Sequence, residues 1–383
     1  MKMSKKQKNV PKLRFPEFTG EWEERRLGDI ATFVNGRAYS QEELLSSGKY
    51  KVLRVGNFYT NDSWYYSDME LDDKYYAVEG DLLYTWSATF GPHIWHGDKV
   101  IYHYHIWKVD LSEHLNKGFT VQLLEHDMTA ITSDKNGSTM VHITKAGMEQ
   151  KEVLIPSDTK EQEEIGLFLT NFDTLITLQQ RKLDQIKEYK KGMLQKMLPK
   201  EGESVPEVRF PGFTGEWERK KLGDVTNEFR SGSFIAASNI FETGMYPVYG
   251  GNGLRGYADS FNHDGEFALI GRQGALCGNM NYSIGKAYFT EHAVAVEANE
   301  QSSTLFLYYL LGTMNLGQYS DQSAQPGLAV GKLVKLQNLF PTKEEQVKIA
   351  QFLNKLDTLI TLHQRKLEAM KEYKKGLLQQ LFV

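Results

Sequence analysis

Four histidines are the residues of this chain whose type and spacing most resemble a metal site. His93, His96, His103 and His105 lie within 13 residues of the sequence, and imidazole nitrogens are common zinc ligands. A zinc site built from them would need thiolate or carboxylate ligands at a matching spacing, and none accompanies them. We therefore interpret all four as ordinary strand histidines, and the sequence predicts no metal and no cofactor.

Two glycine-rich segments are the next candidates for chemistry. Residues 327–332 read GLAVGK, with three residues between the glycines and a leucine after the lysine, so they do not form a phosphate-binding P-loop. Residues 271–274 read GRQG and lack the GxGxxG spacing of a dinucleotide-binding turn. The chain also has no Asn-Pro-Pro-aromatic motif of adenine methyltransferases and no paired-acid-plus-lysine nuclease pattern. Together these absences favour a binding protein over an enzyme.

The composition is that of a globular protein with two or three domains in its 383 residues. Cys277 is the only cysteine, which excludes a disulfide framework and a thiolate metal cluster. The basic start has no apolar core typical of a secretory signal, and no stretch approaches 18 consecutive apolar residues. We therefore expect a cytoplasmic protein that does not bind membranes.

The charge balance argues against a protein that holds nucleic acid alone. The net charge is −4, and residues 31–150 carry 10 lysines and arginines against 16 aspartates and glutamates. Such proteins usually present a basic face. Either basic residues cluster locally in the fold, or a partner supplies most of the phosphate contacts.

The elements that must position any site are arranged as one plan used twice. Residues 11–30 and 206–225 are identical at thirteen of twenty positions, with an offset of 195. Residues 162–197 and 346–381 are identical at twenty-two of thirty-six positions, with an offset of 184. The segments between these blocks are unlike each other. The pattern predicts two copies of an entry motif, a variable domain and a long helix.

The long helices carry strong start signals and a coiled-coil seam. Thr159 with Gln162, and Thr342 with Glu345, fit the capping box. Apolar residues then alternate at spacings of four and three over about five heptads, which is typical of a coiled coil. The alternative is two amphipathic helices that pack only on their own domains. The predicted seam residues are Ile165, Leu169, Phe172, Ile176, Gln179, Leu183, Ile186, Lys190, Met193 and Met197, and then Ile349, Leu353, Leu356, Ile360, His363, Leu367, Met370, Lys374, Leu377 and Leu381.

The chain path predicts that the two helices run antiparallel, because a short linker places the second domain near the end of the first helix. Gln179 and His363 should then approach each other and fix the register. The ammonium groups of Lys190 and Lys374 should reach water while their stems lie in the seam. Gly192 and Gly376 suggest a kink or a close backbone contact, or fraying near the helix ends.

We predict an α+β protein in which two strand-rich domains are joined by an antiparallel coiled coil. Strands are expected at 51–59, 81–86, 100–109 and 287–297, and short helices at 144–151 and 330–338. The aromatic residues of the entry motifs should pack each domain's first segment against the helix junction. The predicted boundaries are 1–10 for a disordered basic start, 11–157 for the first domain, 158–198 for the central helix, 199–205 for a linker, 206–341 for the second domain and 342–383 for the last helix.

This layout resembles a known family, the specificity subunits of type I restriction-modification systems. The resemblance rests on paired RFPxFTGEWExxxLGD entry motifs, and on Ile155–Pro156, Glu161–Gln162, Asp173–Leu183 and Lys187–Gln195 with their copies at Pro341, Glu345–Gln346, Asp357–Leu367 and Lys371–Gln379. It implies a non-catalytic reader of double-stranded DNA with two target-recognition domains, one for each half-site. It also implies partners: two methyltransferase (M) subunits, and restriction (R) subunits that cleave DNA.

Within that interpretation, several side chains are suited to contacts with DNA. Arginine can bind guanine through two hydrogen bonds, and asparagine or glutamine can bind adenine in the same way. For each of them, a solvated loop residue or a turn former is the competing interpretation. The candidates for base contacts are Arg54, Asn57, Thr85, Ser87 and Thr89, and Asn252, Arg255, Arg272 and Gln273; the candidates for phosphate contacts are Lys145, Lys286 and Lys332.

Two rival interpretations remain. The chain could be a scaffold that carries two glycan-binding or protein-binding domains, which predicts no affinity for DNA even with methyltransferase subunits present. It could also be a nuclease or methyltransferase that acts alone, which predicts modification of DNA by the purified chain. Within the favoured class, the chain could serve a system that methylates without restriction.

Overall fold

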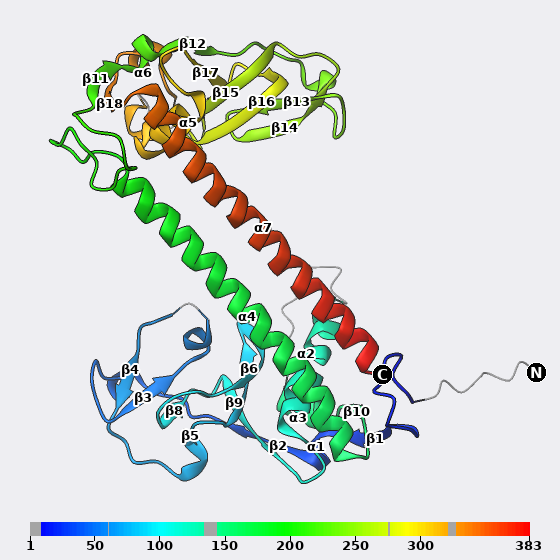
Figure 1. Cartoon of the computed structure of the whole chain (residues 1–383). Helices are drawn as coiled ribbons and strands as arrows, with labels where there is room; N and C mark the ends of the chain where they lie inside the picture. Colours follow the sequence, from blue (N-terminus) through cyan, green and yellow to red (C-terminus); the bar gives the residue numbers. More distant parts are fainter. Residues whose placement is uncertain (1–8, 60, 134–143, 275, 321–326) are drawn as a thin grey trace, which may run out of the picture. The chain divides into compact units, whose positions relative to one another are not determined.

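The computed structural model describes residues 9–59, 61–133, 144–274, 276–320 and 327–383 (Figure 1). The chain divides into two compact units, Met1–Gln180 with Lys366–Val383, and Arg181–Arg365. The long helices α4 Thr159–Lys196 and α7 Lys343–Leu381 each contribute to both units. Both units combine sheets with helices, which confirms the predicted α+β class. No helix of the described residues is long and apolar enough to cross a membrane.

The first unit contains two four-stranded sheets and a two-stranded ribbon. The sheets have the strand orders β2-β9-β6-β7 and β4-β3-β8-β5, and the ribbon pairs β1 with β10. The strands are β1 Glu23–Arg26, β2 Ala31–Asn35, β3 Tyr50–Leu53, β4 Tyr65–Ser67, β5 Tyr76–Ala77, β6 Leu82–Ser87, β7 Thr89–Ile94, β8 Val100–Tyr102, β9 Ile106–Leu111 and β10 Glu152–Ile155. The α-helices before α4 are α1 Leu27–Ile30, α2 Lys117–Ser133 and α3 Lys145–Glu149, and short 3-10 helices span Gln41–Glu43, Val55–Phe58 and Asp73–Tyr75.

The second unit contains a six-stranded sheet of order β12-β17-β15-β16-β13-β14 and a ribbon that pairs β11 with β18. Its strands are β11 Glu218–Lys221, β12 Thr226–Ser231, β13 Tyr246–Gly250, β14 Gly253–Ala258, β15 His263–Gly271, β16 Met280–Phe289, β17 Ala293–Ala298 and β18 Gln337–Phe340. Its helices before α7 are α5 Thr304–Thr313 and α6 Val330–Leu333, and 3-10 helices span Leu222–Val225, Ala237–Asn239 and Leu316–Tyr319.

Several local expectations were wrong because the chain bends where its composition favours strand. Residues 55–58 form a 3-10 helix after β3, and residues 103–105 separate β8 from β9. The helix expected at 330–338 ends at Leu333, and residues 337–340 form β18. Helices α2 and α5 were not predicted; α5 is apolar on nearly every side, with six buried residues, so it lacks the one-sided pattern of a surface helix.

Each entry motif binds the last turn of a long helix. The amide of Leu13 donates to the carbonyl of Gln380 at the end of α7 (2.9 Å), and the amide of Val208 donates to the carbonyl of Lys196 at the end of α4 (2.9 Å). The aromatic residues of the motifs pack beside these contacts: Trp22 lies 6.1 Å from Phe119 between ring centroids. This agrees with the predicted packing role for the motif aromatics.

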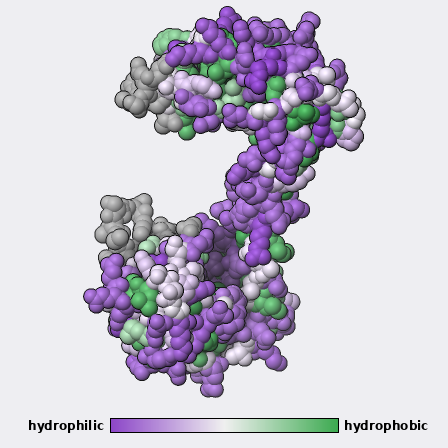
Figure 2. Space-filling model, turned by 90° about the vertical axis from the view of Figure 1, so that its left-hand side faces the viewer, coloured by the Kyte–Doolittle hydropathy of each residue, from purple (hydrophilic) through white to green (hydrophobic). Residues whose placement is uncertain are grey.

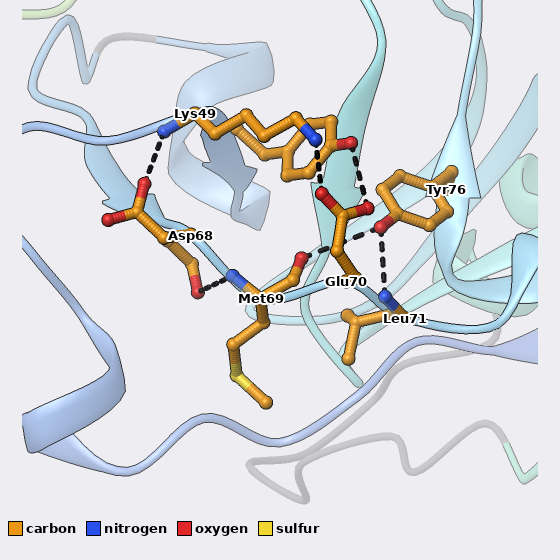
Figure 3. A network of polar contacts seen from close by, with 8 residues as sticks. Lys49, Asp68, Met69, Glu70, Leu71 and Tyr76 are labelled. Carbon is orange, nitrogen blue, oxygen red and sulfur yellow. Dashed lines mark hydrogen bonds and ion pairs between the residues drawn. The ribbon is translucent and has the colours of Figure 1, made fainter.

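A polar network anchors the segment that leads into β5 of the first unit (Figure 3). The amide of Lys49 donates to Oδ1 of Asp68 (2.7 Å), and the ammonium group of Lys49 pairs with Glu70. The hydroxyl of Tyr76 accepts from the amide of Leu71 (2.9 Å). These bonds hold residues 68–71 against the start of β3, so the second sheet keeps its shape without a long edge strand.

The predicted seam positions are all buried or half-buried. Across the seam, the ammonium group of Lys374 lies 2.6 Å from Asp173 in the first unit, and that of Lys190 lies 2.5 Å from Asp357 in the second. The first half of α4 therefore faces the end of α7 in one unit, and the first half of α7 faces the end of α4 in the other. This is the antiparallel arrangement that the chain path predicts.

The expectation that both seam lysines reach water was wrong for Lys374, which is buried and also lies 2.6 Å from Glu125 of α2. Lys190 binds a carboxylate too, but its side chain stays partly exposed. The seam also continues into the core of the first unit, where Ile165 and Leu169 pack with Leu377 and Leu381. Gln179 of α4 belongs to the first unit and His363 of α7 to the second, so their expected approach stays a prediction.

The helix starts also differ from the predicted capping boxes. Asp158 caps α4, because its Oδ1 accepts from the amide of Lys160 (2.9 Å). The side chain of Gln162 instead donates to the carbonyls of Pro156 and His114 (both 2.9 Å). At α7, Oγ1 of Thr342 accepts from the amide of Glu345 at 3.5 Å, which is the expected first half of a capping box. The second half is missing because the Glu345 carboxylate binds an arginine.

Gly192 and Gly376 do not meet a close backbone, because a Cβ atom added at either position would find nothing within 4 Å; the kink stays a prediction. Both lie inside regular helix. Alanine at each position should therefore stabilise the protein by about 0.5–1 kcal/mol through reduced backbone entropy of the unfolded chain. Thermal melts of Gly192→Ala, Gly376→Ala and the double variant should show additive increases in Tm. A decrease would mean that a partner or a bend needs the glycine.

Candidate nucleic-acid interface

The two domains share one backbone frame although their sequences differ. The loop before β9 in the first domain and the loop before β17 in the second each bind three neighbouring segments through equivalent backbone hydrogen bonds. In the first domain these bonds run from His103 N to Leu53 O, from Ile106 N to His103 O, from Gly36 N to Ile106 O and from Trp86 N to His105 O. In the second domain the corresponding bonds run from Thr290 N to Tyr249 O, from Ala293 N to Thr290 O, from Gly232 N to Ala293 O and from Arg272 N to His292 O. All of them are 2.9–3.2 Å long. Trp86 is therefore equivalent to Arg272, and residues 103–105 are equivalent to 290–292.

We call the surface at the end of β6 in the first domain, and at the end of β15 in the second, the recognition edge. In the first domain it consists of residues 86–89, which form the end of β6, the turn and the start of β7, and of residues 103–105, which precede β9. In the second domain it consists of residues 272–274 and 290–292, after β15 and before β17. Loops placed at the ends of strands are common binding surfaces, because the sheet holds them rigidly.

The first recognition edge is aromatic. The indole Nε1 of Trp86 donates to the carbonyl of Tyr104 (2.9 Å), and the Trp86 and His105 rings meet edge to face at 5.1 Å. Tyr104 is exposed, and its ring also contacts His103 (4.4 Å) and His105 (3.9 Å). Ala88, with a φ of 63°, makes the tight turn between β6 and β7.

The candidates of the first domain have unequal access to solvent. Thr85 is fully buried, and its hydroxyl donates to the carbonyl of Gly91 (3.3 Å), so we remove it from the candidates. The side chain of Asn57 forms hydrogen bonds within its own loop: its Oδ1 accepts from the amide of Arg54 (3.0 Å), and its Nδ2 donates to the carbonyl of Ser63 (3.0 Å). The guanidinium of Arg54 stacks 4.3 Å from the centre of the Tyr65 ring. Only Ser87 and Thr89 of the five lie on the recognition edge.

The structure gathers three candidates of the second domain. Arg272 and Gln273 lie on the recognition edge. The turn between β13 and β14, which carries the exposed Asn252, lies against it: a Cβ added at Gly271 would come 2.2 Å from the carbonyl of Gly251. The Arg272 guanidinium donates to the carbonyl of Leu328 and to the hydroxyl of Ser231, both at 3.3 Å, so it is held partly by its own domain. Arg255 is exposed on β14, beyond this turn.

The three candidate lysines lie on three different elements, Lys145 in the first unit and Lys286 and Lys332 in the second. Lys145 pairs with Glu149 one turn later on α3 (3.4 Å). Lys286 lies 4.7 Å above the ring of Phe261. Lys332 is exposed on α6. Their roles as phosphate contacts stay predictions.

Of the four clustered histidines only His93 lies in a strand, so the interpretation as strand histidines was wrong for the other three. His93 stacks on Phe58 at 4.2 Å. The exposed His96 lies 2.7 Å from Glu79, whereas His103 and His105 lie on the recognition edge. Within the described ranges, no three histidine, cysteine or carboxylate side chains are grouped to hold a metal ion.

Two of these histidines make the stability of the first domain depend on pH. Burial lowers the pKa of His93 to about 4, and burial, His105 and Arg54 lower that of His103 to about 4. The unfolded chain binds these protons near the ordinary value of about 6.5. Stability is therefore fully present above pH 6.5 and is lost as the pH falls through 6.5 towards 4.

We expect His93→Phe to flatten this loss, because phenylalanine keeps the stack on Phe58 and cannot take up a proton. Melts between pH 4.5 and 7.5 should show a smaller fall in Tm for the variant than for the parent protein. Equal slopes for the two proteins would contradict the assignment to His93.

The edge residues Trp86, Tyr104 and His105 were missed as candidates. The sequence search favoured arginine and amide side chains, whereas the first domain presents rings. The available signal was the run YHYHIW at 102–107, in which aromatic residues and histidines alternate.

Comparisons with known proteins agree with this architecture. The family model described as type I restriction modification DNA specificity domain matches residues 19–188 and 214–372. The type I restriction enzyme EcoprrI specificity subunit of Escherichia coli is 49% identical over 148 residues, which are 38% of this chain and 37% of that protein. The MjaVIII specificity subunit of Methanocaldococcus jannaschii is 24% identical over 413 residues, covering 98% and 94% of the two chains.

Solved structures show the same fold. The S subunit of a type I restriction-modification system from M. genitalium matches with a TM-score of 0.70 at 18% identity, over 98% of this chain and 99% of that one. A chain from a structure concerning complex assembly of the type I R-M system matches with a TM-score of 0.54 at 14% identity, over 94% and 97% of the chains. Because the two matched regions take in most of the sequence, and each carries one recognition edge on a common frame, the chain belongs to the type I restriction-modification DNA specificity family.

Proposed function

We propose that this chain reads a bipartite, asymmetric sequence in double-stranded DNA, with one half-site for each domain. The observation that carries the proposal is that one backbone frame presents unlike side chains at equivalent positions: Trp86 and Tyr104 in the first domain, Arg272 and Glu291 in the second. Two domains with the same backbone frame are suited to bind two stretches of one polymer, and unlike side chains on that frame are suited to recognise unlike base pairs. The pair of long helices, each about 57 Å at 1.5 Å per residue, sets the unread gap.

We assign no catalytic role to the chain. Methyl transfer to adenine and DNA cleavage belong to other subunits, the methyltransferase (M) and restriction (R) subunits. The negative balance of the first domain supports this division, because phosphate contacts supply much of the affinity for DNA and need positive charge. The M subunits clamp the backbone, while this chain contributes the base contacts.

Two equivalent apolar patches support assembly with two copies of one partner. We call them the leucine patches: Leu175 and Leu178 on α4 in the first unit, and Leu359 and Leu362 on α7 in the second. These leucines are 53%, 53%, 43% and 55% exposed, respectively. Exposed leucines at this spacing on one helix face suit an amphipathic helix of a partner. Figure 2 shows a surface that is mostly hydrophilic, with small hydrophobic areas.

The test is sequencing of N6-methyladenine in DNA from cells that express this chain with its methyltransferase. We expect a split, non-palindromic motif with a constant gap. Transplanting the second recognition domain of a related subunit should change one half of the motif and leave the other half and the gap unchanged. A continuous palindrome would contradict two unlike readers.

The rival scaffold function makes the opposite prediction. A glycan-binding or protein-binding scaffold would leave the methylation pattern of the cell unchanged, and the chain with its methyltransferase would not retard DNA in a gel.

A further inference from the structure

We propose that the recognition edge of the first domain reads a thymine, by packing the ring of Tyr104 and the turn at Ala88 against the 5-methyl group in the major groove. This inference rests on the proposed function and names the base feature that one of the two domains recognises. It is carried by the aromatic composition of the edge, by its rigidity and by its contrast with the equivalent edge of the second domain.

The edge is held rigidly from below. Tyr84, Trp107 and Trp86 stack in series on β6 and β9, with ring centroids 5.8 Å apart at each step and interplanar angles of 15° and 19°. Tyr84 and Trp107 are buried in the core of the first unit, and Trp86 is half-buried at the surface end of the stack. The hydrogen bond from Trp86 Nε1 to the Tyr104 carbonyl fixes the loop before β9 on this stack. Little conformational entropy remains to be lost when a ligand binds.

The exposed part of the edge consists of the Tyr104 ring and of the turn at Ala88, which are linked through Trp86. Tyr104 is 39% exposed. Ala88 and Thr89 are exposed at the tip of the turn that follows Trp86. A positive φ at Ala88 is costly for a residue with a Cβ, and the local structure retains it. Loops that a sheet holds rigidly commonly carry the residues that bind a ligand.

The residue types of this edge select the base feature. Residues 86–89 read WSAT and residues 103–105 read HYH, so the edge contains no arginine, lysine, amide or carboxylate. Burial lowers the pKa of both His103 and His105, which favours the uncharged form of each imidazole. The thymine 5-methyl is the apolar group of the major groove. Aromatic and methyl surfaces recognise it by apolar contact, whereas Arg272 and Gln273 at the equivalent edge of the second domain are suited to hydrogen bonds.

The experiment measures binding of the complete specificity–methyltransferase complex to a duplex that carries the motif found by methylation sequencing. Each thymine of each half-site is replaced in turn by deoxyuridine, which removes only the methyl group. Fluorescence anisotropy at about 0.15 M salt gives the dissociation constants. For one thymine of the half-site read by the first domain, we expect about a fourfold loss of affinity, the equivalent of one buried methyl group.

The variant Tyr104→Ala should bind the thymine duplex more weakly than the parent and should bind the thymine and deoxyuridine duplexes with equal affinity. Tyr104 contributes only its backbone to the hydrogen bond with Trp86, so the variant keeps this bond while it loses the ring contacts with His103 and His105. Glu291→Ala is the matched control, because it makes the same truncation at the equivalent loop position of the second domain. It should retain the fourfold difference at the first half-site.

Equal binding of thymine and deoxyuridine at every position of the first half-site would overturn the inference. So would a Tyr104→Ala variant that retains the fourfold difference. Both results leave the proposed function intact, provided that the parent complex still distinguishes its motif from a scrambled duplex. Failure of the parent complex to make that distinction would instead contradict the proposed function itself.

Discussion

Replacing Glu345 with alanine should destabilise the second unit by about 3–5 kcal/mol, the cost of leaving one partner of a buried ion pair alone. The Glu345 side chain is fully buried and receives two hydrogen bonds from Arg209, from Nε (2.7 Å) and from Nη2 (2.8 Å). Arg209 also donates to the carbonyl of Gly215 (2.6 Å), which closes the turn of the entry motif. The variant therefore leaves a guanidinium without its counter-charge and releases the motif from the start of α7.

The repeat offers a second test of the same interaction. In the first unit, Arg14 binds Glu161 through Nε and Nη2, both at 2.7 Å, and donates to the carbonyl of Gly20 (2.6 Å). Glu161→Ala should destabilise the first unit by a similar amount.

Hydrogen exchange measured by mass spectrometry assigns each effect to a unit. Glu345→Ala should speed exchange in peptides of the second unit, and Glu161→Ala in peptides of the first. Glu344→Ala, at an exposed position of the same turn of α7, is the control and should change stability by no more than about 0.5 kcal/mol. A Glu345→Ala protein as stable as this control would show that the buried pair contributes nothing to the fold.

Aspartate at the leucine patches should remove the methyltransferase subunits from the complex. Leu175→Asp with Leu178→Asp should weaken one M subunit by more than about a hundredfold, because two apolar anchors are lost and two carboxylates would be buried. Leu359→Asp with Leu362→Asp should do the same to the other. The exposure of the four leucines means that the chain itself should keep its fold and its Tm.

Native mass spectrometry of the assembled complex measures this directly. The parent should carry two M subunits, each double variant one, and the quadruple variant none, with loss of methylation in cells. Thr177→Asp and Thr361→Asp are the controls, since these exposed threonines lie about 200° around their helices from Leu175 and Leu359. A quadruple variant that still binds two M subunits would place the partner interface elsewhere.

The repeated parts of the fold were predictable, and the reason is visible in the contacts. The seam of α4 and α7 follows from an apolar period, and the antiparallel direction follows from the short linker between the first helix and the second domain. The packing of the entry-motif aromatics was also expected. The partner of the motif arginine was not, because Arg14 and Glu161 are 147 residues apart and only the closed chain brings them together.

The variable domains were predicted less well. Helix α5 is buried on most sides, so its sequence has no one-sided period. The break between β8 and β9 falls inside an aromatic run that reads as continuous strand. The candidate list for base contacts included Thr85, which alternation along β6 turns into the interior, and omitted Tyr104, whose exposure depends on a loop held by Trp86.

By itself, the sequence determined that this protein has two copies of one plan, two unlike domains and a pair of long antiparallel helices, because repeats and apolar periods can be read directly from the order of the residues. Only the tertiary structure decided which side chains form the recognition edges and which carboxylates take the seam lysines. Those outcomes depend on hydrogen bonds and ion pairs between segments far apart in the chain, such as Trp86 with residues 104–105 and Lys374 with Asp173. No local pattern encodes such pairs, since their energy appears only after the chain has closed around them.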